Sequence, residues 1–443
     1  MAFAENRRDT RDIFDLADRF QAAWTRTDQL FDTIRHQAML SKPIVFRHPF
    51  IFYVGHLPAF AWNQICAGVL HRPSINPRFD DIFSRGIDPD VDSGSCHTHP
   101  EVPQNWPSVA AVLGYRDRVR TAVLNSFDAV YSHSAADVMA EHGRVYHMVL
   151  EHEYMHQETL LYMIHALTDE MKIRPRDFCG YHFDPAPARK LIAVPHGQAH
   201  LGANFDDLLF GWDNEFPALV VDVDEFAIDS LPVTNQEFLE FLLASGYSEQ
   251  RFWQAADWAW QRERGIDHPQ FWQRQNAEWL YHTVFDRLPL TQVASWPVYV
   301  SLAEARAFAA WRGARLPTEA EFHRAAYGSG AEKSGLRSGN LDFRNWSPVP
   351  VGFYAEDANP SGVRDLVGNG WEWTQSEFRG FPGFEPYLTN YREYSADFFD
   401  GKHFVLKGGS WGTHAALARP SFRNWYQAHY PYVFGKFRCV EAN

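Results

Sequence analysis

The sequence contains little cysteine and no long apolar run. Only four cysteines occur among 443 residues, and their scattered positions show no spacing typical of a metal site. We interpret them as free thiols of a reducing compartment and expect a cytoplasmic protein. No apolar run approaches the roughly 20 residues that cross a bilayer. Residues 1–12 also lack the hydrophobic core of a secretory signal, so we expect no membrane partner.

Positive charge is scarce as well. The formal net charge is −14 and no cluster of Lys and Arg stands out, so we expect no nucleic-acid partner. Hydrophobic content of 45% with 22% charged residues is typical of a folded globular protein. Aromatic residues reach 16%, which suits aromatic-walled pockets or a loop-rich domain held together by rings.

The first part of the chain shows the hydrophobic periodicity of helices. Apolar residues recur at three- and four-residue steps. The segments concerned are residues 11–35, 50–70, 108–127 and 136–167. Four helices joined by loops predict an up-down bundle, whose core is a common place for metal ligands. Between the second and third helices, residues 76–107 are rich in Gly, Pro, Asp and Ser, and this loop is long enough to suggest a functional role.

The amino-acid composition changes after a connection that contains several prolines. Short strand-like runs then alternate with Gly, Asn and Pro turns. These runs lie at residues 217–229, 296–301, 404–411 and 435–442, and two helical segments follow one another at 301–314 and 317–328. We therefore predict a multidomain α and α+β protein, with a helical domain at 1–175, a linker at 176–196 and an irregular α+β domain at 197–443.

Two histidines lie four residues apart in LEHEYMHQETLLYM, residues 150–163. His152 and His156 share one face of a helix, so both can reach one ion. The spacing fits two core histidines equally well. Imidazole suits zinc, copper and iron alike, so the spacing does not choose a metal.

The same segment spells H-E-x-x-H, which is also the pattern of zinc peptidases. That reading assigns Glu153 as the general base. The metzincin extension is missing, because Thr159 and Tyr162 stand where a glycine and a third histidine are required. A third histidine could instead come from another helix, and His56 in YVGHLPAFAWN lies among apolar residues of a predicted bundle helix.

Six motifs together carry a resemblance to a known family. They are GHLPAFAWN (55–63), EHEYMHQET (151–159), RLPTEAEFHRAA (315–326), GNGWEWT (368–374), LKGGSW (406–411) and SFRNW (421–425). The chain resembles the ergothioneine-pathway sulfoxide synthases of the EgtB family, and more distantly the ovothiol enzymes. The resemblance covers nearly the whole chain. It implies a DinB-like four-helix bundle followed by a formylglycine-generating-enzyme domain of the C-type-lectin-like fold.

The resemblance implies an oxygenase-type oxidoreductase. His56, His152 and His156 match the family's ligands of a non-heme Fe(II). With O2 as co-substrate, such enzymes join a cysteine-type thiol, cysteine or γ-glutamylcysteine, to C2 of hercynine (trimethylhistidine) and oxidise the sulfur to a sulfoxide. Redox-silent zinc could not supply this chemistry. Close alternatives are an ovothiol-type synthase acting on unmethylated histidine and a selenoneine synthase using a selenosugar.

The resemblance also implies roles for individual residues. Gln157 resembles a glutamine that contacts the substrate, and Asn424 and Trp425 resemble residues of the trimethylhistidine pocket. An aromatic face attracts a quaternary ammonium group, which gives Trp425 a physical rationale. We expect Tyr394 to add to that cage. Tyr391 resembles the tyrosine that supplies a hydrogen bond or a proton during the oxygen chemistry.

Recognition of the thiol is predicted from charge. A thiol substrate carries carboxylates, so arginines should line its site. Arg116 and Arg120 lie on one helical face, although such a face is usually just solvated. Family members that use γ-glutamylcysteine often have Asp directly after FRNW, whereas Tyr426 stands there in this chain. This departure leaves free cysteine open as the sulfur donor.

Overall fold

The chain divides into two compact units, the first ending at Pro175 and the second running from Arg176 to Asn443. The computed structural model describes residues 10–83, 89–90, 95–96, 105–132, 137–328, 339–354, 361–388, 391 and 393–442. Much of the loop 76–107, for which we predicted a functional role, lies outside the described residues, as do residues 1–9.

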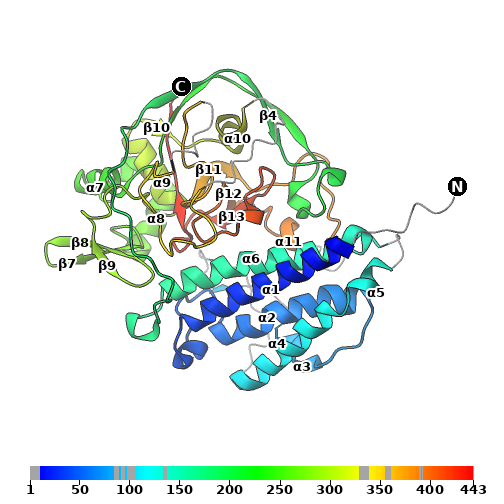
Figure 1. Ribbon diagram of the computed structural model, residues 1–443. Coiled ribbons are helices and arrows are strands. Elements are labelled where there is room, and N and C mark those ends of the chain that lie inside the picture. The colour runs from blue at the N-terminus through cyan, green and yellow to red at the C-terminus, as the bar shows by residue number, and fades with distance from the viewer. Residues whose placement is uncertain are drawn as a thin grey trace. The chain divides into compact units, whose positions relative to one another are not determined.

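Four long helices form the first unit, and the predicted bundle is confirmed (Figure 1). They are α1 (Thr10–Asp32), α2 (Phe50–Ala61), α4 (Val109–Leu124) and α6 (Arg144–His165). Helix α2 packs against α4 and α6, and α1 packs against α6. Every residue of α2 is buried, as expected for a helix that is apolar on all sides. It therefore forms the centre of the bundle.

The ends of the bundle helices have local causes. Ser108 caps α4 as predicted, because its hydroxyl oxygen accepts a hydrogen bond from the Ala111 amide at 3.3 Å. Helix α6 begins later than the predicted segment 136–167. His142 and Gly143 adopt φ values of 53° and 66°, which a right-handed helix does not contain. Helix α2 continues as an unpredicted π-helix, Trp62–Val69.

The second unit combines sheets and helices, which confirms the α+β class. One sheet has the order β13 (Asn424–Gln427), β12 (His403–Lys407), β11 (Trp371–Glu377) and β14 (Gly435–Lys436). Another has the order β10 (Ala314–Arg315), β15 (Val440–Glu441), β6 (Phe226–Asp229) and β3 (Leu191–Val194). A two-stranded sheet pairs β4 (Gly197–Leu201) with β5 (Leu219–Val223). A three-stranded sheet has the order β7 (Trp272–Gln275), β8 (Glu278–His282) and β9 (Arg287–Pro289). Strand β3 lies within the segment that we expected to be a linker.

Capping boxes start three helices of this unit. Thr234, Ser301 and Thr318 each exchange hydrogen bonds with a glutamate three residues later. The helices are α7 (Asn235–Leu243), α9 (Leu302–Trp311) and α10 (Glu319–Tyr327). We predicted α9 and α10 but not α7 or α8 (Ala255–Arg264). The strand predicted at 296–301 was wrong, because this buried run forms only one isolated bridge, at Pro297.

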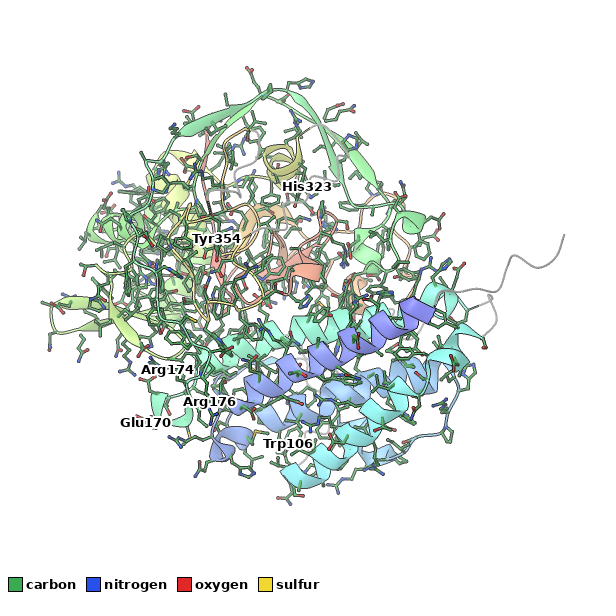
Figure 2. All side chains as sticks on the ribbon, viewed as in Figure 1. Trp106, Glu170, Arg174, Arg176, His323 and Tyr354 are labelled. Carbon is green, nitrogen blue, oxygen red and sulfur yellow. The ribbon has the colours of Figure 1, made fainter. Side chains whose placement is uncertain are left out.

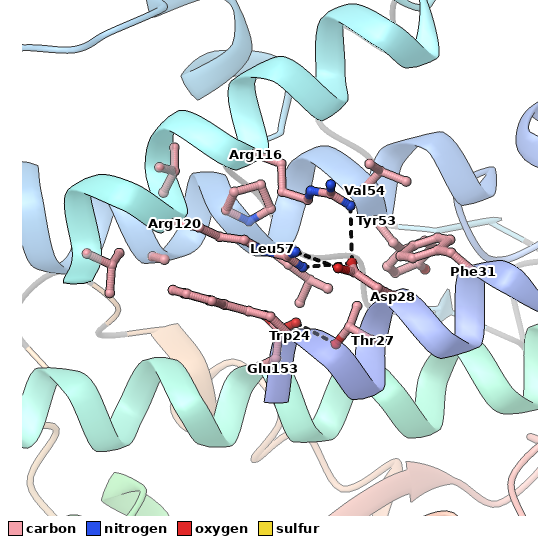
Figure 3. A pocket seen from close by; sticks show the side chains of 14 residues that line it. Trp24, Thr27, Asp28, Phe31, Tyr53, Val54, Leu57, Arg116, Arg120 and Glu153 are labelled. Atoms are coloured by element: carbon pink, nitrogen blue, oxygen red, sulfur yellow. Dashed lines mark hydrogen bonds and ion pairs between the residues drawn. The ribbon is translucent and has the colours of Figure 1, made fainter. Parts of the chain in front are cut away.

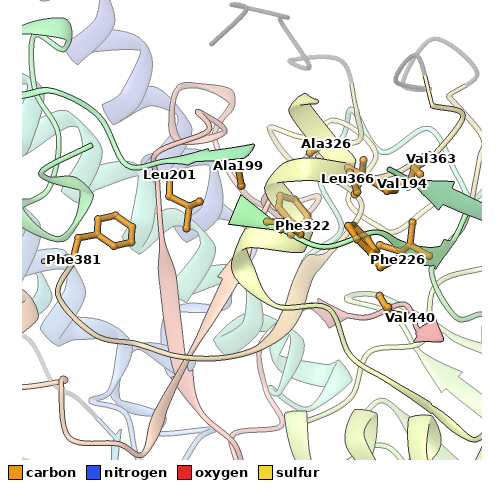
Figure 4. Packing of buried hydrophobic residues seen from close by; sticks show 13 residues of the cluster. Val194, Ala199, Leu201, Phe226, Phe322, Ala326, Val363, Leu366, Phe381 and Val440 are labelled. Carbon is orange, nitrogen blue, oxygen red and sulfur yellow. The ribbon is translucent and has the colours of Figure 1, made fainter. Parts of the chain in front are cut away.

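An apolar core holds α10 against the sheets (Figure 4). Phe322 of α10, Ile228 of β6 and Val440 of β15 are all completely buried within one cluster. Burying one such side chain stabilises a fold by about 1.5–3 kcal/mol. The neighbouring His323, labelled in Figure 2, is buried as well, at 2% exposure. Since α10 also contacts β11 and β12, this core fixes the sheet that carries the SFRNW motif.

Among the described residues, no helix is long and apolar enough to span a membrane. Cys66, Cys179 and Cys439 are free thiols, as predicted. The side chain of Cys96 lies outside the part of the chain that the structure describes.

Candidate active site

Three histidines converge inside the helical unit. His56 lies on α2, and His152 and His156 lie one turn apart on α6. Each offers one ring nitrogen, and these atoms all lie within 4.8 Å of one another. The Nε2 atoms of His56 and His156 are 3.2 Å apart. Two nitrogens bound to one ion at about 2.1 Å would be separated by roughly 3.0–3.4 Å, so this pair is spaced as ligands of a single metal.

The tautomer of His56 suits metal binding. Its Nδ1 lies 2.8 Å from the carbonyl oxygen of Phe83. Because a carbonyl can only accept, Nδ1 carries the proton, and the lone pair of Nε2 faces His156. A carbonyl on the far nitrogen is the usual support of a metal-binding histidine, since it fixes both tautomer and ring orientation.

Aromatic rings enclose the histidines. Phe60 stacks on His152 with a centroid separation of 3.6 Å, and Phe52 stacks on His56 at 4.9 Å. Phe83 and Trp106 (Figure 2) pack around Phe52 at 6.2 and 6.3 Å. These apolar walls hold the imidazole planes in place and limit the access of water.

Burial keeps the three imidazoles neutral. Desolvation lowers the pKa of His56 to about 4 and the pKa values of His152 and His156 well below their usual range. Neutral imidazole is the form that binds metals. Nδ1 of His156 is buried without a hydrogen-bond partner among the described residues. A set of neutral nitrogen donors in an apolar enclosure fits a divalent transition metal such as iron.

Arg47 is a charged residue of this region that we did not predict. Its side chain is 7% exposed, and its guanidinium lies over the Tyr162 ring at 5.5 Å. Burial lowers the pKa of both His48 and His156, and the charge of Arg47 lowers it further. A single arginine ahead of an apolar helix has no periodicity, so the sequence offered no signal for a buried cation here.

Glu153 and Gln157 contact α1 instead of pointing at the histidine cluster. The Thr27 hydroxyl donates to Glu153 Oε1 at 2.5 Å. The amide nitrogen of Gln157 donates to Thr27 Oγ1 at 3.1 Å and to the Ala23 carbonyl at 3.0 Å. Both N–H donors of Gln157 are thus used inside the bundle, and its contact with a substrate stays a prediction. Glu153 is not placed as a peptidase base would be.

Arg116 and Arg120 lie in a pocket of the bundle (Figure 3). Arg116 contacts Asp28 at 3.1 Å, and Arg120 binds both oxygens of Asp28 at 2.7 and 2.9 Å. Arg120 also lies over the Trp24 ring at 5.3 Å. The two arginines share a face as predicted, but Asp28 already neutralises part of their charge. Their binding of a thiol substrate stays a prediction.

That pocket and the histidine cluster use different faces of α2. Tyr53, Leu57 and Ala61 line the pocket, whereas His56 is flanked by Phe52 and Phe60. Residues one position apart on a helix project about 100° apart. Tyr53 nevertheless borders both regions, because its ring also lies 5.6 Å from that of His156.

In the second unit, three predicted aromatic residues meet. Trp425 on β13 stacks on Phe378 at 4.3 Å and meets the Tyr394 ring edge-on at 5.2 Å. Tyr391 lies 5.4 Å from Tyr394, measured between ring centroids. Trp212, which we did not predict, stacks on Tyr394 at 4.0 Å. Such a cluster has the ring faces that attract a quaternary ammonium group.

The neighbours of Trp425 point elsewhere. Successive side chains of a strand leave on opposite faces, so Asn424 and Tyr426 leave β13 opposite Trp425. Asn424 Oδ1 accepts a hydrogen bond from the Trp425 amide at 3.0 Å. Tyr426 stacks on Tyr430 at 4.9 Å and is not part of the aromatic cluster. Its role beside the substrate stays a prediction.

Known proteins resemble this chain along nearly its whole length. The DinB superfamily model matches residues 19–160, and the model of the sulfatase-modifying factor enzyme 1-like domain matches 182–443. An "Ergothioneine biosynthesis protein 1" from Neurospora crassa is 30% identical over 96% of this chain, which spans 57% of that relative. A "Hercynine oxygenase" from Mycolicibacterium thermoresistibile is 37% identical over 69% of both chains. Another from Mycobacterium tuberculosis is 35% identical over 75% of this chain and 78% of its own.

The two matched regions include the residues of the candidate site. The helical match contains His56, His152 and His156, and the other match contains Tyr394 and Trp425. The chain belongs to the EgtB family of sulfoxide synthases.

Proposed function

We propose that the protein is a cytoplasmic, Fe(II)- and O2-dependent sulfoxide synthase of ergothioneine biosynthesis. It joins the sulfur of a cysteine-type thiol to C2 of hercynine. The S–H and C2–H bonds are replaced by a C–S bond, one oxygen atom enters the sulfoxide, and the other leaves as water. These steps give up four electrons, which reduce one O2. The observation that carries the proposal is the convergence of His56, His152 and His156.

The histidines are proposed to hold the iron. A ferrous ion bound there would supply redox chemistry with O2. Three neutral imidazoles leave its charge uncompensated, which favours an anionic sulfur ligand. The buried Arg47 adds a further positive charge near His156 that favours an anionic substrate.

The second unit is proposed to recognise hercynine. Trp425 and Tyr394 offer aromatic faces to the trimethylammonium group. We keep Asn424 as a predicted contact of the amino-acid group, although its side chain leaves β13 opposite Trp425, and the Tyr391 phenol can donate a proton. For the thiol we keep Arg116, Arg120 and Gln157 as predicted contacts, although each already has partners within the bundle.

Anaerobic reconstitution tests this function. The protein is loaded with Fe(II), given O2, hercynine and either cysteine or γ-glutamylcysteine, and the products are read by mass spectrometry. We expect the sulfoxide of at least one conjugate, and none with Zn(II) in place of Fe(II). Parallel reactions with histidine and with a selenosugar separate the ovothiol-type and selenoneine-type alternatives. If neither thiol yields a sulfoxide conjugate, the proposal is wrong.

The variant Glu153→Gln separates this function from that of a zinc peptidase. Burial raises the pKa of Glu153 to about 7, and glutamine keeps an oxygen that can accept from Thr27. We therefore expect kcat/KM for sulfoxide formation to change by less than about threefold, whereas loss of a general base typically costs about 10²–10⁴-fold. Steady-state rates of the iron-loaded variant provide the measurement, and a hundredfold loss would contradict our assignment.

A further inference from the structure

One short segment, residues 211–215, holds both ends of the stretch that carries Tyr391. At one end, the Tyr387 hydroxyl donates a hydrogen bond to the Gly211 carbonyl. At the other end, the Ser395 hydroxyl donates to Asp213 Oδ1. The Asn214 amide donates to the same Ser395 oxygen at 2.9 Å. The 211–215 segment therefore brackets Tyr391 from both sides.

The residues that make the contacts with Ser395 are buried. Asp213 and Ser395 are completely buried, and Asn214 is 1% exposed. The second carboxylate oxygen of Asp213 and the amide oxygen of Asn214 have no hydrogen-bond partner among the described residues. Ser395 is thus the side-chain partner that these two residues share.

The helix that contains Ser395 is too short to be stable without tertiary contacts. Helix α11 (Glu393–Ala396) has only four residues, about one turn, and one turn is far too short to be stable alone. Its position must come from tertiary contacts. Besides those of Ser395, these contacts include the stacking of Trp212 on Tyr394 at 4.0 Å and the edge-on contact of Tyr394 with Trp425 at 5.2 Å.

The same segment also holds the stretch that leads into Trp425. Ser421 donates to Glu215 Oε2 at 2.6 Å, and Arg419 binds the same carboxylate. Arg423 donates to the Asn214 carbonyl at 3.2 Å. The 211–215 segment therefore links the two stretches of chain that carry the predicted hercynine contacts.

We propose that Asp213 and Asn214, acting through Ser395, are positioning residues that set Tyr391 and Tyr394 relative to Trp425. The inference rests on the proposed function, because it uses the predicted role of Tyr391 in sulfoxide formation. None of the three polar residues needs to touch a substrate. Their effect is to keep the Tyr391 phenol where its proton is useful, and a misplaced phenol lets oxidation of the thiol alone compete.

The test compares products of matched variants of the full-length, iron-loaded protein. With hercynine, thiol and O2, we expect Ser395→Ala to lower the ratio of sulfoxide conjugate to oxidised thiol roughly 3- to 10-fold, since small displacements of a reacting group are costly. Asp213→Ala should do the same. Asp213→Asn keeps the shape and an acceptor for the Ser395 hydroxyl, so its ratio should stay near that of the wild type.

Ser301→Ala is the matched control. Ser301 is also completely buried and also donates to a carboxylate, that of Glu304 at 2.7 Å, but it caps α9. It should lower the melting temperature and leave the product ratio unchanged. A wild-type ratio in folded Ser395→Ala, or an equal shift in Ser301→Ala, overturns the positioning role. Should Ser395→Ala not fold, equal ratios in Asp213→Ala and Asp213→Asn overturn it. A wild-type protein that makes no sulfoxide contradicts the proposed function instead.

Discussion

Replacing His152 by alanine is expected to abolish both iron binding and sulfoxide formation. Even the loss of a contact that merely supports a metal ligand costs about 10- to 100-fold in metal affinity or activity, so the loss of a ligand should cost more than about 100-fold. Only His56 and His156 would remain of the three converging nitrogens. Two imidazoles hold a divalent ion much more weakly than three, because water must fill the freed position.

The measurement is iron content after anaerobic loading and desalting, followed by product analysis. His147→Ala is a matched control on the same helix, since His147 is an α6 histidine that lies outside the cluster and contacts Arg19 at 3.5 Å. We expect the control to bind one equivalent of iron. Loss of the ring that stacks on Phe60 will also lower stability, so the melting temperature of each apoprotein is compared as well. A His152→Ala protein that retains one equivalent of iron and turns over would contradict the assignment.

The sequence predicted the parts of this site that depend on local spacing. His152 and His156 share a face because a helix repeats every 3.6 residues. The placement of His56 beside them came from a family resemblance, since no local rule joins α2 to α6. The Phe83 carbonyl that orients His56 was not predictable, because Phe83 lies 27 residues further along the chain. Contacts of this kind are set by tertiary packing.

Charge was harder to interpret than spacing. We expected Arg116 and Arg120 to bind a substrate carboxylate, but both form ion pairs with Asp28 of α1. An aspartate on a helix of alternating charges looks solvated in a sequence, so nothing there signals that Asp28, whose side chain stays partly exposed, pairs with arginines of another helix. Arg47 gives no signal either, because it occupies an ordinary loop position and is nevertheless buried.

Strand geometry refined the predictions for the second unit. From the motif SFRNW we predicted that the adjacent residues Asn424 and Trp425 line one pocket. The side chains of neighbouring strand residues, however, point to opposite faces of the sheet. Trp425 and Tyr394, which are distant in sequence, are the residues whose rings meet. Trp212 and Asp213 belong to a segment with no motif that we recognised, and only the fold shows that they contact α11.

Replacing Tyr391 by phenylalanine is expected to divert turnover from the sulfoxide conjugate to oxidation of the thiol alone. A tyrosine hydroxyl can donate a proton or a hydrogen bond. Phenylalanine removes the hydroxyl but keeps the ring that packs 5.4 Å from Tyr394. General acid catalysis contributes about 10²–10⁴-fold, so C–S bond formation should fall by that factor.

Thiol oxidation should survive the change. Adding both atoms of O2 to a thiol gives a sulfinic acid without any proton from the protein, so that reaction continues when the phenol is gone. The ratio of the two products, measured by mass spectrometry under single-turnover conditions, separates this effect from simple unfolding. Tyr394→Phe is the matched control, because it also removes one hydroxyl and keeps a ring between Trp212 and Trp425. We expect it to raise KM for hercynine modestly and to leave the ratio intact. Unchanged C–S bond formation in Tyr391→Phe would show that another residue donates the proton.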